Sequence, residues 1–268
     1  TALKQHFVAT ADVALTQDIL SEINPETTLF IIASKTFKTL ETLTHAQAIR
    51  EWMESRLGPA AIQQHFIAIT ANHAAARSFG VPEEHIFPIW DWVGGRFSIW
   101  SAMGLPLMLS IGAPLFNDFL AGAYDMDQHF KQQEFSKNMP VILALMSLWY
   151  VHFFKTNAQA IAPYAYRLRY FVPYLQQLAM ESTGKNTNID GLPIHYPTSP
   201  VIFGAEGSHG QHAYHQLLHQ GQHLIPVDFI LTGDTEDLSI ASGLSQALAL
   251  MQGNAHQREV DSSEKINY

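Results

Sequence analysis

The stretch "TLFIIASKTFKTLET", residues 28–42, decides the fold class of this chain. A short apolar run ends at Ser34, and a segment rich in hydroxyl groups then leads into a longer amphipathic stretch. An apolar run of this length is typical of a buried strand, and the segment after it is typical of a loop and a helix start. The alternation recurs along the chain, and it predicts strands at 28–34, 65–70 and 86–90 with helices near 40–57 and 72–79.

A second set of elements follows a helix predicted at 97–112, which we expect to be a buried core helix. This set has a helix at 139–154, strands near 160–164, 200–204 and 224–231, and a final helix at 236–252. The last dozen or so residues are polar and are expected to fray. Strands alternating with helices predict an α/β fold, with parallel sheets covered by helices on both faces. Gly112 and Pro114 interrupt the pattern, so we expect one domain at 1–112 and another at 113–268.

Composition limits the classes of function. Hydrophobic residues make up 47% of the 268 residues and charged residues only 15%, where roughly 25% charged is usual. We therefore expect a partner subunit, or protein outside this chain, to cover part of the surface. A net charge of −9 argues against binding to nucleic acid or to an anionic membrane. There is no cysteine, which excludes disulfides and thiolate chemistry.

Neither the longest apolar stretch nor the start of the chain indicates a membrane protein or an export signal. The segment 97–112 is shorter than a membrane span and is broken by Gly104 and Pro106. The first residue is Thr1, and the opening residues match neither a signal peptide nor a transit peptide. We interpret this start as a cut made inside a longer protein.

The first motif with chemical content is "SKTFKTLET", residues 34–42. A strand end followed by a helix N-terminus is a common place for phosphate in α/β folds, because backbone N–H groups and the helix dipole converge there. Ser34, Lys35, Thr36 and Thr39 add hydroxyl groups and a cation, which suits a phosphate monoester. An ordinary N-cap with a solvated first turn explains the same residues.

The second motif is "WDWVGGRFS", residues 90–98. Two glycines, Gly94 and Gly95, let the backbone come close to another molecule, and Arg96 brings a permanent charge to the same place. A tight turn with Arg96 paired to Asp91 is an equally good interpretation.

A third group of residues lies further along. Glu181, in "QQLAMESTGK" (176–185), is a candidate general base or an ordinary helix end. The stretch "GSHGQHAYHQLLHQGQH" (207–223) holds five histidines. His215 and His219 have the spacing of zinc-protease ligands, but Gln216 stands where such a protease needs a glutamate base. With no carboxylate ligand nearby, we expect no metal.

Taken together, these blocks resemble the glucose-6-phosphate isomerase (phosphoglucose isomerase) family, in the order in which that family carries them. The resembling segments are "NPETTLFIIASKTFKTLET", "FPIWDWVGGRFSIWSAMGLP", "QQLAMESTGK" and "GQHAYHQLLHQGQHLIPVDFI". The resemblance implies two αβα sandwich domains of the sugar isomerase type. Residues 1–112 would be most of the small domain and residues 113–268 part of the large one.

The resemblance also implies an activity and a set of roles. The activity is interconversion of glucose 6-phosphate and fructose 6-phosphate in glycolysis and gluconeogenesis, in the cytoplasm and without cofactor or metal. Further implied are a homodimer with a shared active site, in which the catalytic histidine comes from the neighbouring subunit, and no nucleic-acid or membrane partner. The implied catalytic residues are Glu181 as the base, Arg96 at the enediolate, His212 as the ring-opening group and Glu41 as its support; Ser34, Lys35, Thr36 and Thr39 would bind phosphate, and Gln177 and Gly95 the sugar.

The chain departs from the family pattern in three respects. "GSHGQH" replaces the family's "GTNGQH", so that Ser208 and His209 stand for a threonine and an asparagine, and Lys38 stands where a threonine is common. The family's glycine-rich phosphate turn and its lysine-bearing C-terminal block have no counterpart here, so we expect the chain alone to be inactive. A non-catalytic sugar-phosphate-binding module of the same fold is the alternative.

Overall fold

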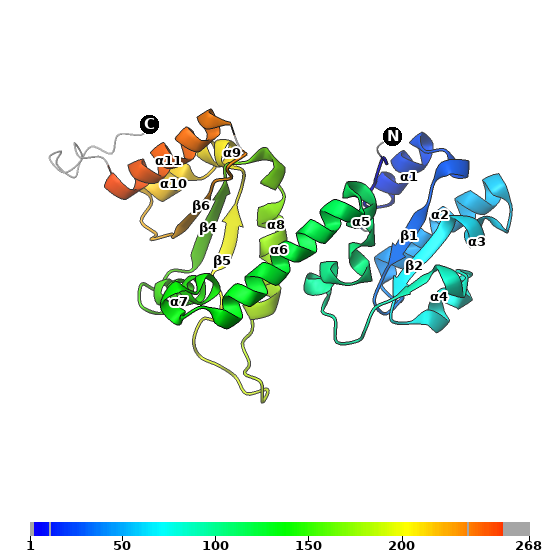
Figure 1. Ribbon diagram of the computed structural model, residues 1–268, viewed down its shortest axis with the longest axis horizontal. Helices are drawn as coiled ribbons and strands as arrows, with labels where there is room; N and C mark the ends of the chain where they lie inside the picture. The colour runs from blue at the N-terminus through cyan, green and yellow to red at the C-terminus, as the bar shows by residue number, and fades with distance from the viewer. Residues whose placement is uncertain (1–2, 11, 235, 254–268) are drawn as a thin grey trace. The chain divides into compact units, whose positions relative to one another are not determined.

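The computed structural model describes residues 3–10, 12–234 and 236–253. It divides the chain into two compact units, Thr1–His129 and Phe130–Tyr268. Each unit contains a three-stranded parallel sheet with helices packed beside it (Figure 1). The predicted α/β class with parallel sheets is confirmed. The frayed end expected for the last dozen residues lies outside the described residues.

In the first unit the sheet order is β1-β2-β3. Its strands are β1 (Phe30–Ala33), β2 (Phe66–Thr70) and β3 (Ile86–Pro88). The α-helices of this unit are α1 (Val13–Glu22), α2 (Leu40–Leu57), α3 (Ala61–His65), α4 (His73–Phe79), α5 (Leu105–Ile111) and α6 (Ala113–Gln132), the last of which runs into the second unit. The 3₁₀ turns are η1 (Pro25–Thr27), η2 (Glu83–His85), η3 (Gly95–Trp100) and η4 (Ala102–Gly104).

The core of the first unit is built around the central strand. All five residues of β2 are buried, as a strand covered on both faces requires. The ring of Phe66 stacks on that of Phe30, its partner in the register of β1 and β2, at 5.2 Å between centroids. Met53 of α2 is fully buried against the same cluster. This packing fixes the ends of β1 and β2, where the candidate site begins.

The second unit has the sheet order β5-β4-β6. Its strands are β4 (Ala158–Pro163), β5 (Val201–Gly204) and β6 (Val227–Ile230). Its helices are α7 (Met139–His152), α8 (Phe171–Leu175), α9 (Gly207–Gln211), α10 (His215–Gln220) and α11 (Asp237–Gln252), with 3₁₀ turns η5 (Phe135–Lys137) and η6 (Tyr166–Leu168) and a π-helical turn η7 (Gln176–Glu181). A cluster of Ile161, Val172 and Ile202 forms the core between β4, β5 and α8.

The single buried core helix predicted at 97–112 is wrong. The segment forms η3, η4 and then the short helix α5, no residue of which is buried. The chain is extended at Ser101, between η3 and η4, and a Cβ at Gly104 would lie 2.5 Å from the carbonyl oxygen of Ile99. Gly112 and Pro114, where the sequence predicts a domain boundary, end α5 and begin α6, and the first compact unit extends to His129.

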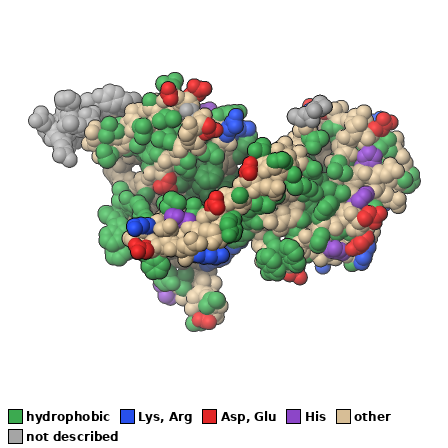
Figure 2. Space-filling view, in the orientation of Figure 1, with side chains coloured by type: hydrophobic (Ala, Val, Ile, Leu, Met, Phe, Trp, Pro, Cys, Tyr) green, Lys and Arg blue, Asp and Glu red, His purple; other side chains and the backbone are tan. Residues whose placement is uncertain are grey.

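Large hydrophobic side chains stay exposed on α6 and α7, and Figure 2 shows hydrophobic side chains spread over the visible surface. On α7 the exposed residues are Met139, Leu143, Leu145, Met146, Leu148 and Trp149. Even so, none of the described helices combines the length and the apolar character that crossing a membrane requires. The exposure agrees with the low charged fraction of the sequence.

Candidate active site

The loop after β1 presents hydroxyl groups at the start of α2. Ser34 is buried, and its amide still donates to the carbonyl of Ile69 at 3.1 Å. Its Oγ lies 3.1 Å from Oγ1 of Thr39. Thr39 occupies the N-cap position of α2, yet its side chain makes no capping hydrogen bond, although threonine usually caps there. The first-turn N–H groups of this 18-residue helix and two hydroxyls thus form a setting suited to an anion.

Phe37 anchors this loop in the core. It has a φ of 52°, in the left-handed region that a bulky residue seldom adopts. Its side chain is 3% exposed and its ring lies 5.9 Å from that of Phe79, edge to face. Burial of the ring thus offsets the strained backbone and leaves Thr36 and Thr39 on the exposed side of the loop. An apolar residue inside a hydroxyl-rich loop is the sequence signal for this anchor.

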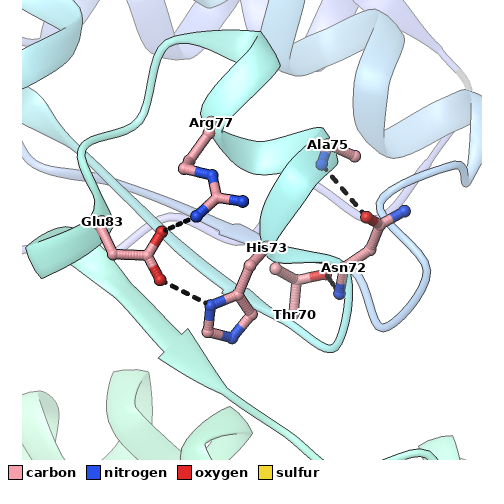
Figure 3. Close-up of polar contacts among 6 residues, drawn as sticks. All are labelled: Thr70, Asn72, His73, Ala75, Arg77 and Glu83. Carbon is pink, nitrogen blue, oxygen red and sulfur yellow. Dashed lines mark hydrogen bonds and ion pairs between the residues drawn. The ribbon is translucent and has the colours of Figure 1, made fainter.

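The end of β2 holds the carbonyl groups of the same loop. Lys35 O accepts from Ala71 N at 2.9 Å and from Thr70 Oγ1 at 3.0 Å. Thr36 O accepts from Asn72 Nδ2 at 3.1 Å. Asn72 Oδ1 in turn accepts from Ala75 N and caps α4 (Figure 3). Because these carbonyl oxygens are engaged by β2 and Asn72, they are held within the protein, which lowers their repulsion of an anion at the loop.

The loop after β3 carries Gly95 and Arg96. Neither Gly94 nor Gly95 has a positive φ, so the fold does not need glycine here for backbone conformation. A Cβ at Gly95 would meet nothing within 4 Å, so an approaching molecule has room to reach this backbone. Arg96 is partly buried, with its guanidinium carbon 5.3 Å from the ring centroid of Phe97.

Two further predicted residues of the first unit lie beside these loops. Glu41 is exposed in the first turn of α2, two residues after Thr39. The Lys35 ammonium donates to the main-chain carbonyls of Val93, at 3.1 Å, and Asp91. The structure therefore joins the predicted phosphate loop to the loop that carries Arg96.

In the second unit, Gln177 and Glu181 share the π-helical turn η7. Such turns are rare and are frequent at functional sites. The turn is fixed by Gln176, whose Nε2 donates to Ile202 O at 3.0 Å. The Lys185 ammonium donates to the main-chain carbonyl of Glu181 at 2.6 Å. Glu181 is exposed at the last position of the widened turn, so its carboxylate reaches solvent or a ligand.

His212 follows α9, the helix made by the motif "GSHGQ". Both glycines of α9 lie against tyrosine rings: a Cβ at Gly207 would be 2.4 Å from the ring of Tyr164, and one at Gly210 would be 2.6 Å from Tyr214 Oη. Burial raises the pKa of Tyr164 to about 12. The Tyr164 hydroxyl donates to Gln246, whose Nε2 donates to Gln211 Oε1 at 2.9 Å. These contacts, which the sequence did not reveal, fix the residue before His212.

The substituted residues of this motif have a shared partner. Ser208 Oγ donates to Glu206 Oε1 at 2.5 Å, and His209 Nδ1 lies 3.2 Å from Glu206 Oε2. His209 is thus paired with the carboxylate of Glu206, at the N-cap of α9. His212 is exposed, two positions after Gly210.

The remaining histidines are not gathered into a metal site. His215 and His219 lie on α10, four positions apart. In the described part of the chain there is no group of three or more histidine, aspartate or glutamate side chains placed to hold a metal ion. His215 Nε2 is buried without a hydrogen-bond partner among the described residues, and burial lowers the pKa of His215 below its ordinary value of 6.5.

Comparison with known proteins places these features in one family. Residues 1–266 match the phosphoglucose isomerase family. The chain is 49% identical over 260 residues to glucose-6-phosphate isomerase of Ectopseudomonas mendocina, covering 94% of this chain and 47% of that protein. It is 50% identical over 260 residues to the enzyme of Pseudomonas putida strain F1, with the same two coverages. The chain therefore spans about half the length of the curated relatives it matches.

Solved structures agree with this match. A glucose-6-phosphate isomerase from Chlamydia trachomatis aligns with a TM-score of 0.81 and 31% identity, over 93% of this chain and 51% of that one. A hypothetical protein from Thermus thermophilus, 23% identical, shares the fold with a TM-score of 0.77 over 92% of this chain and 63% of the other. From the motifs, the parallel sheets and the match over nearly its whole length, the chain belongs to the phosphoglucose isomerase family.

Proposed function

We propose that the polypeptide carrying this chain interconverts glucose 6-phosphate and fructose 6-phosphate by ring opening and proton transfer through an enediolate. The observation that carries the proposal is the loop of Ser34 and Thr39, whose paired hydroxyls stand at a helix N-terminus without a side-chain cap. A phosphate monoester is a dianion with several acceptor oxygens, which such hydroxyls and amides bind well. Lys35 and Thr36 complete the proposed phosphate site.

Ring opening is the proposed task of His212. The step moves a proton onto the ring oxygen while the C1 hydroxyl loses one, and an imidazole suits both transfers near neutral pH. The contacts of α9 with Tyr164 and Tyr214 support this role, because they hold the segment that ends in His212. Glu41 supports the histidine in the proposal.

Proton transfer is the proposed task of Glu181. Its carboxylate removes the proton from C2 of the open-chain aldose and returns it to C1, while the hydroxyl proton on O2 passes to O1, which leaves the ketose. Negative charge develops on oxygen in the enediolate, and the fixed charge of Arg96 stabilises it there. Gln177, on the same turn as Glu181, and the open backbone at Gly95 are proposed to contact the sugar. The chemistry needs no metal or redox cofactor.

The proposal extends to organisation and partners. Residues 1–112 are proposed to be most of a small sugar isomerase domain, and residues 113–268 part of a large one. The active enzyme is proposed to be a cytoplasmic homodimer in which a neighbouring subunit supplies His212. Hydrophobic side chains exposed on α6 and α7 support the presence of covering protein.

A non-catalytic module that only binds sugar phosphate is the rival, and Glu181→Gln decides between them. The variant keeps the shape of the side chain but removes the base, so it should lower the turnover of the full-length polypeptide by about 10² to 10⁴. Binding of substrate should stay nearly unchanged. The exposed Glu134→Gln is the matched control and should leave turnover intact.

The measurement is a coupled assay together with exchange of solvent tritium into C2. A wild-type polypeptide that binds glucose 6-phosphate without turning it over would establish the rival. Tritium exchange at the wild-type rate in the Glu181→Gln variant would remove Glu181 from the mechanism.

A further inference from the structure

Lys35 connects two loops that the sheet keeps apart. In the order β1-β2-β3 the strands β1 and β3 are not neighbours. Lys35 follows β1, yet its ammonium donates to the carbonyls of Asp91 and Val93 after β3. The side chain therefore passes the carboxyl end of β2 and joins the loops of the two outer strands.

This connection is made by a charged donor. Hydrogen bonds from an ammonium are roughly twice as strong as those between neutral groups. Among the described residues, no carboxylate lies within ion-pair distance of the Lys35 ammonium. Its two partners are neutral carbonyls, so its positive charge stays available beside the Ser34–Thr39 loop.

Other contacts also hold the loop after β3, among them the Ser98 hydroxyl, which donates to Gly95 O at 2.6 Å. Val93 is buried. In the main chain, Ile89 N donates a hydrogen bond to Thr70 O, and Val93 N donates one to Trp90 O. Trp90 and Trp92 stack on each other at 5.5 Å but are 58% and 79% exposed. A Cβ at Gly95 would touch nothing. The two bonds from Lys35 thus tie the backbone leading into Arg96 to the loop after β1.

We propose that Lys35 is a positioning residue, which holds the Arg96 loop at a fixed place relative to the phosphate loop. The inference rests on the proposed function, because it assigns Lys35 a role in the chemical step beyond contact with phosphate. In the proposed mechanism, Arg96 stabilises the negative charge of the enediolate at one end of the sugar, while the phosphate is bound at the other end. A displacement of about 1 Å at the reacting end costs up to roughly 10²-fold in rate.

Two roles of Lys35 predict different kinetics. A residue that only binds phosphate contributes equally to ground state and transition state, so its loss raises KM and leaves kcat unchanged. A residue that positions Arg96 contributes at the transition state, so its loss lowers kcat at saturating substrate. We expect Lys35→Met to lower kcat of the full-length polypeptide by about tenfold or more.

Hydrogen exchange tests the connection without relying on activity. In the 268-residue chain, Lys35→Met should speed amide exchange in residues 90–96 by about tenfold, as expected for the loss of about one charge-assisted bond. Exchange in β2 should stay unchanged. Lys38→Met is the matched control, because Lys38 is an exposed lysine of the same loop; it should alter neither exchange nor kcat. Lys35→Arg, which keeps several N–H donors, should restore most of the protection.

The outcomes separate the two proposals. Unchanged exchange at 90–96 in Lys35→Met, or a raised KM with unchanged kcat, overturns the positioning role. If Lys35→Met also loosens β2, Lys35→Arg is measured instead: wild-type protection at 90–96 supports the role, and lost protection in a folded variant overturns it. If the wild-type polypeptide shows no isomerase activity, the proposed function fails, and exchange still decides whether Lys35 holds the loop.

Discussion

At the scale of single residues, the histidine-rich stretch divides into residues with different surroundings. His209 lies within ion-pair distance of Glu206, and His212 is exposed after α9. The Nε2 atom of His215 is buried. Their spacing in sequence is nearly regular, so the sequence alone could not tell them apart. In the folded chain, contacts with Glu206 and with the protein interior distinguish these histidines from one another.

The proposed role of His212 leads to a specific prediction. His212→Ala should impair turnover of cyclic glucose 6-phosphate far more than turnover of an open-chain analogue, because only the cyclic sugar needs ring opening. General acid/base groups contribute about 10² to 10⁴ in rate. Kinetics with both substrates measure this, and His219→Ala, also exposed on this segment, is the control. Equal losses on both substrates would assign His212 to another step.

His215 should make stability depend on pH. Burial lowers its pKa in the folded chain, so at falling pH the unfolded chain takes up the proton first. Stability is therefore fully present above the ordinary pKa of 6.5 and decreases as pH falls through that value towards the folded pKa. His215→Phe should reduce this slope. Urea denaturation at pH 7.5 and 5.5 measures it, and an equal slope in both proteins would contradict the prediction.

At the scale of elements, apolar runs alone predict the strands. All six lie within three residues of the expected ranges, because central parallel strands are continuous apolar runs. The helices at 40–57 and 139–154 are likewise found as α2 and α7. No sequence pattern predicts helix α6, whose Phe116 ring packs closely against Gly104 of the broken segment 97–112: a Cβ at Gly104 would lie 2.8 Å from that ring.

The candidate site is predictable only in its residue types. Motif spacing places Ser34 and Thr39 at a helix start and Glu181 at a helix end, which the structure bears out. No local pattern predicts the π-helical turn, and the contacts of Phe37 with Phe79 and of Lys35 with Val93 join residues far apart in sequence. Such pairings arise from packing and therefore need the three-dimensional structure.

The close packing of α9 on tyrosine rings predicts a cost for a single methyl group. Gly207→Ala should destabilise the second unit by about 1–3 kcal/mol, the usual effect of overpacking, because the ring of Tyr164 is buried and cannot move away. Gly233→Ala is the control, since a Cβ there meets nothing within 4 Å. Thermal denaturation of both variants measures the difference, and equal stabilities would show that α9 shifts freely.

At the scale of the whole molecule, we expect the 268-residue chain to have no measurable isomerase activity on its own. It covers 47% of the E. mendocina relative, and the resemblance leaves the glycine-rich turn and the lysine-bearing block without a counterpart. Lost phosphate contacts remove binding energy that positions C1 and C2 at the base. A coupled assay of purified chain measures this, with the full-length polypeptide as control. Turnover within about tenfold of the full-length rate would contradict the expectation.

The two sheets differ in the order in which the chain visits their strands, and this difference predicts an order of folding. In the first sheet β2 pairs with β3, the next strand along the chain, through Ala68 and Ile86. In the second sheet β4 pairs with β6 through Ala160 and Val227, and the whole of β5 and its connections lies between them in sequence. Closing a longer loop costs more entropy, and folding slows as contacts become less local. We therefore expect the first sheet to assemble ahead of the second, and during synthesis to do so while most of the second is still to be made.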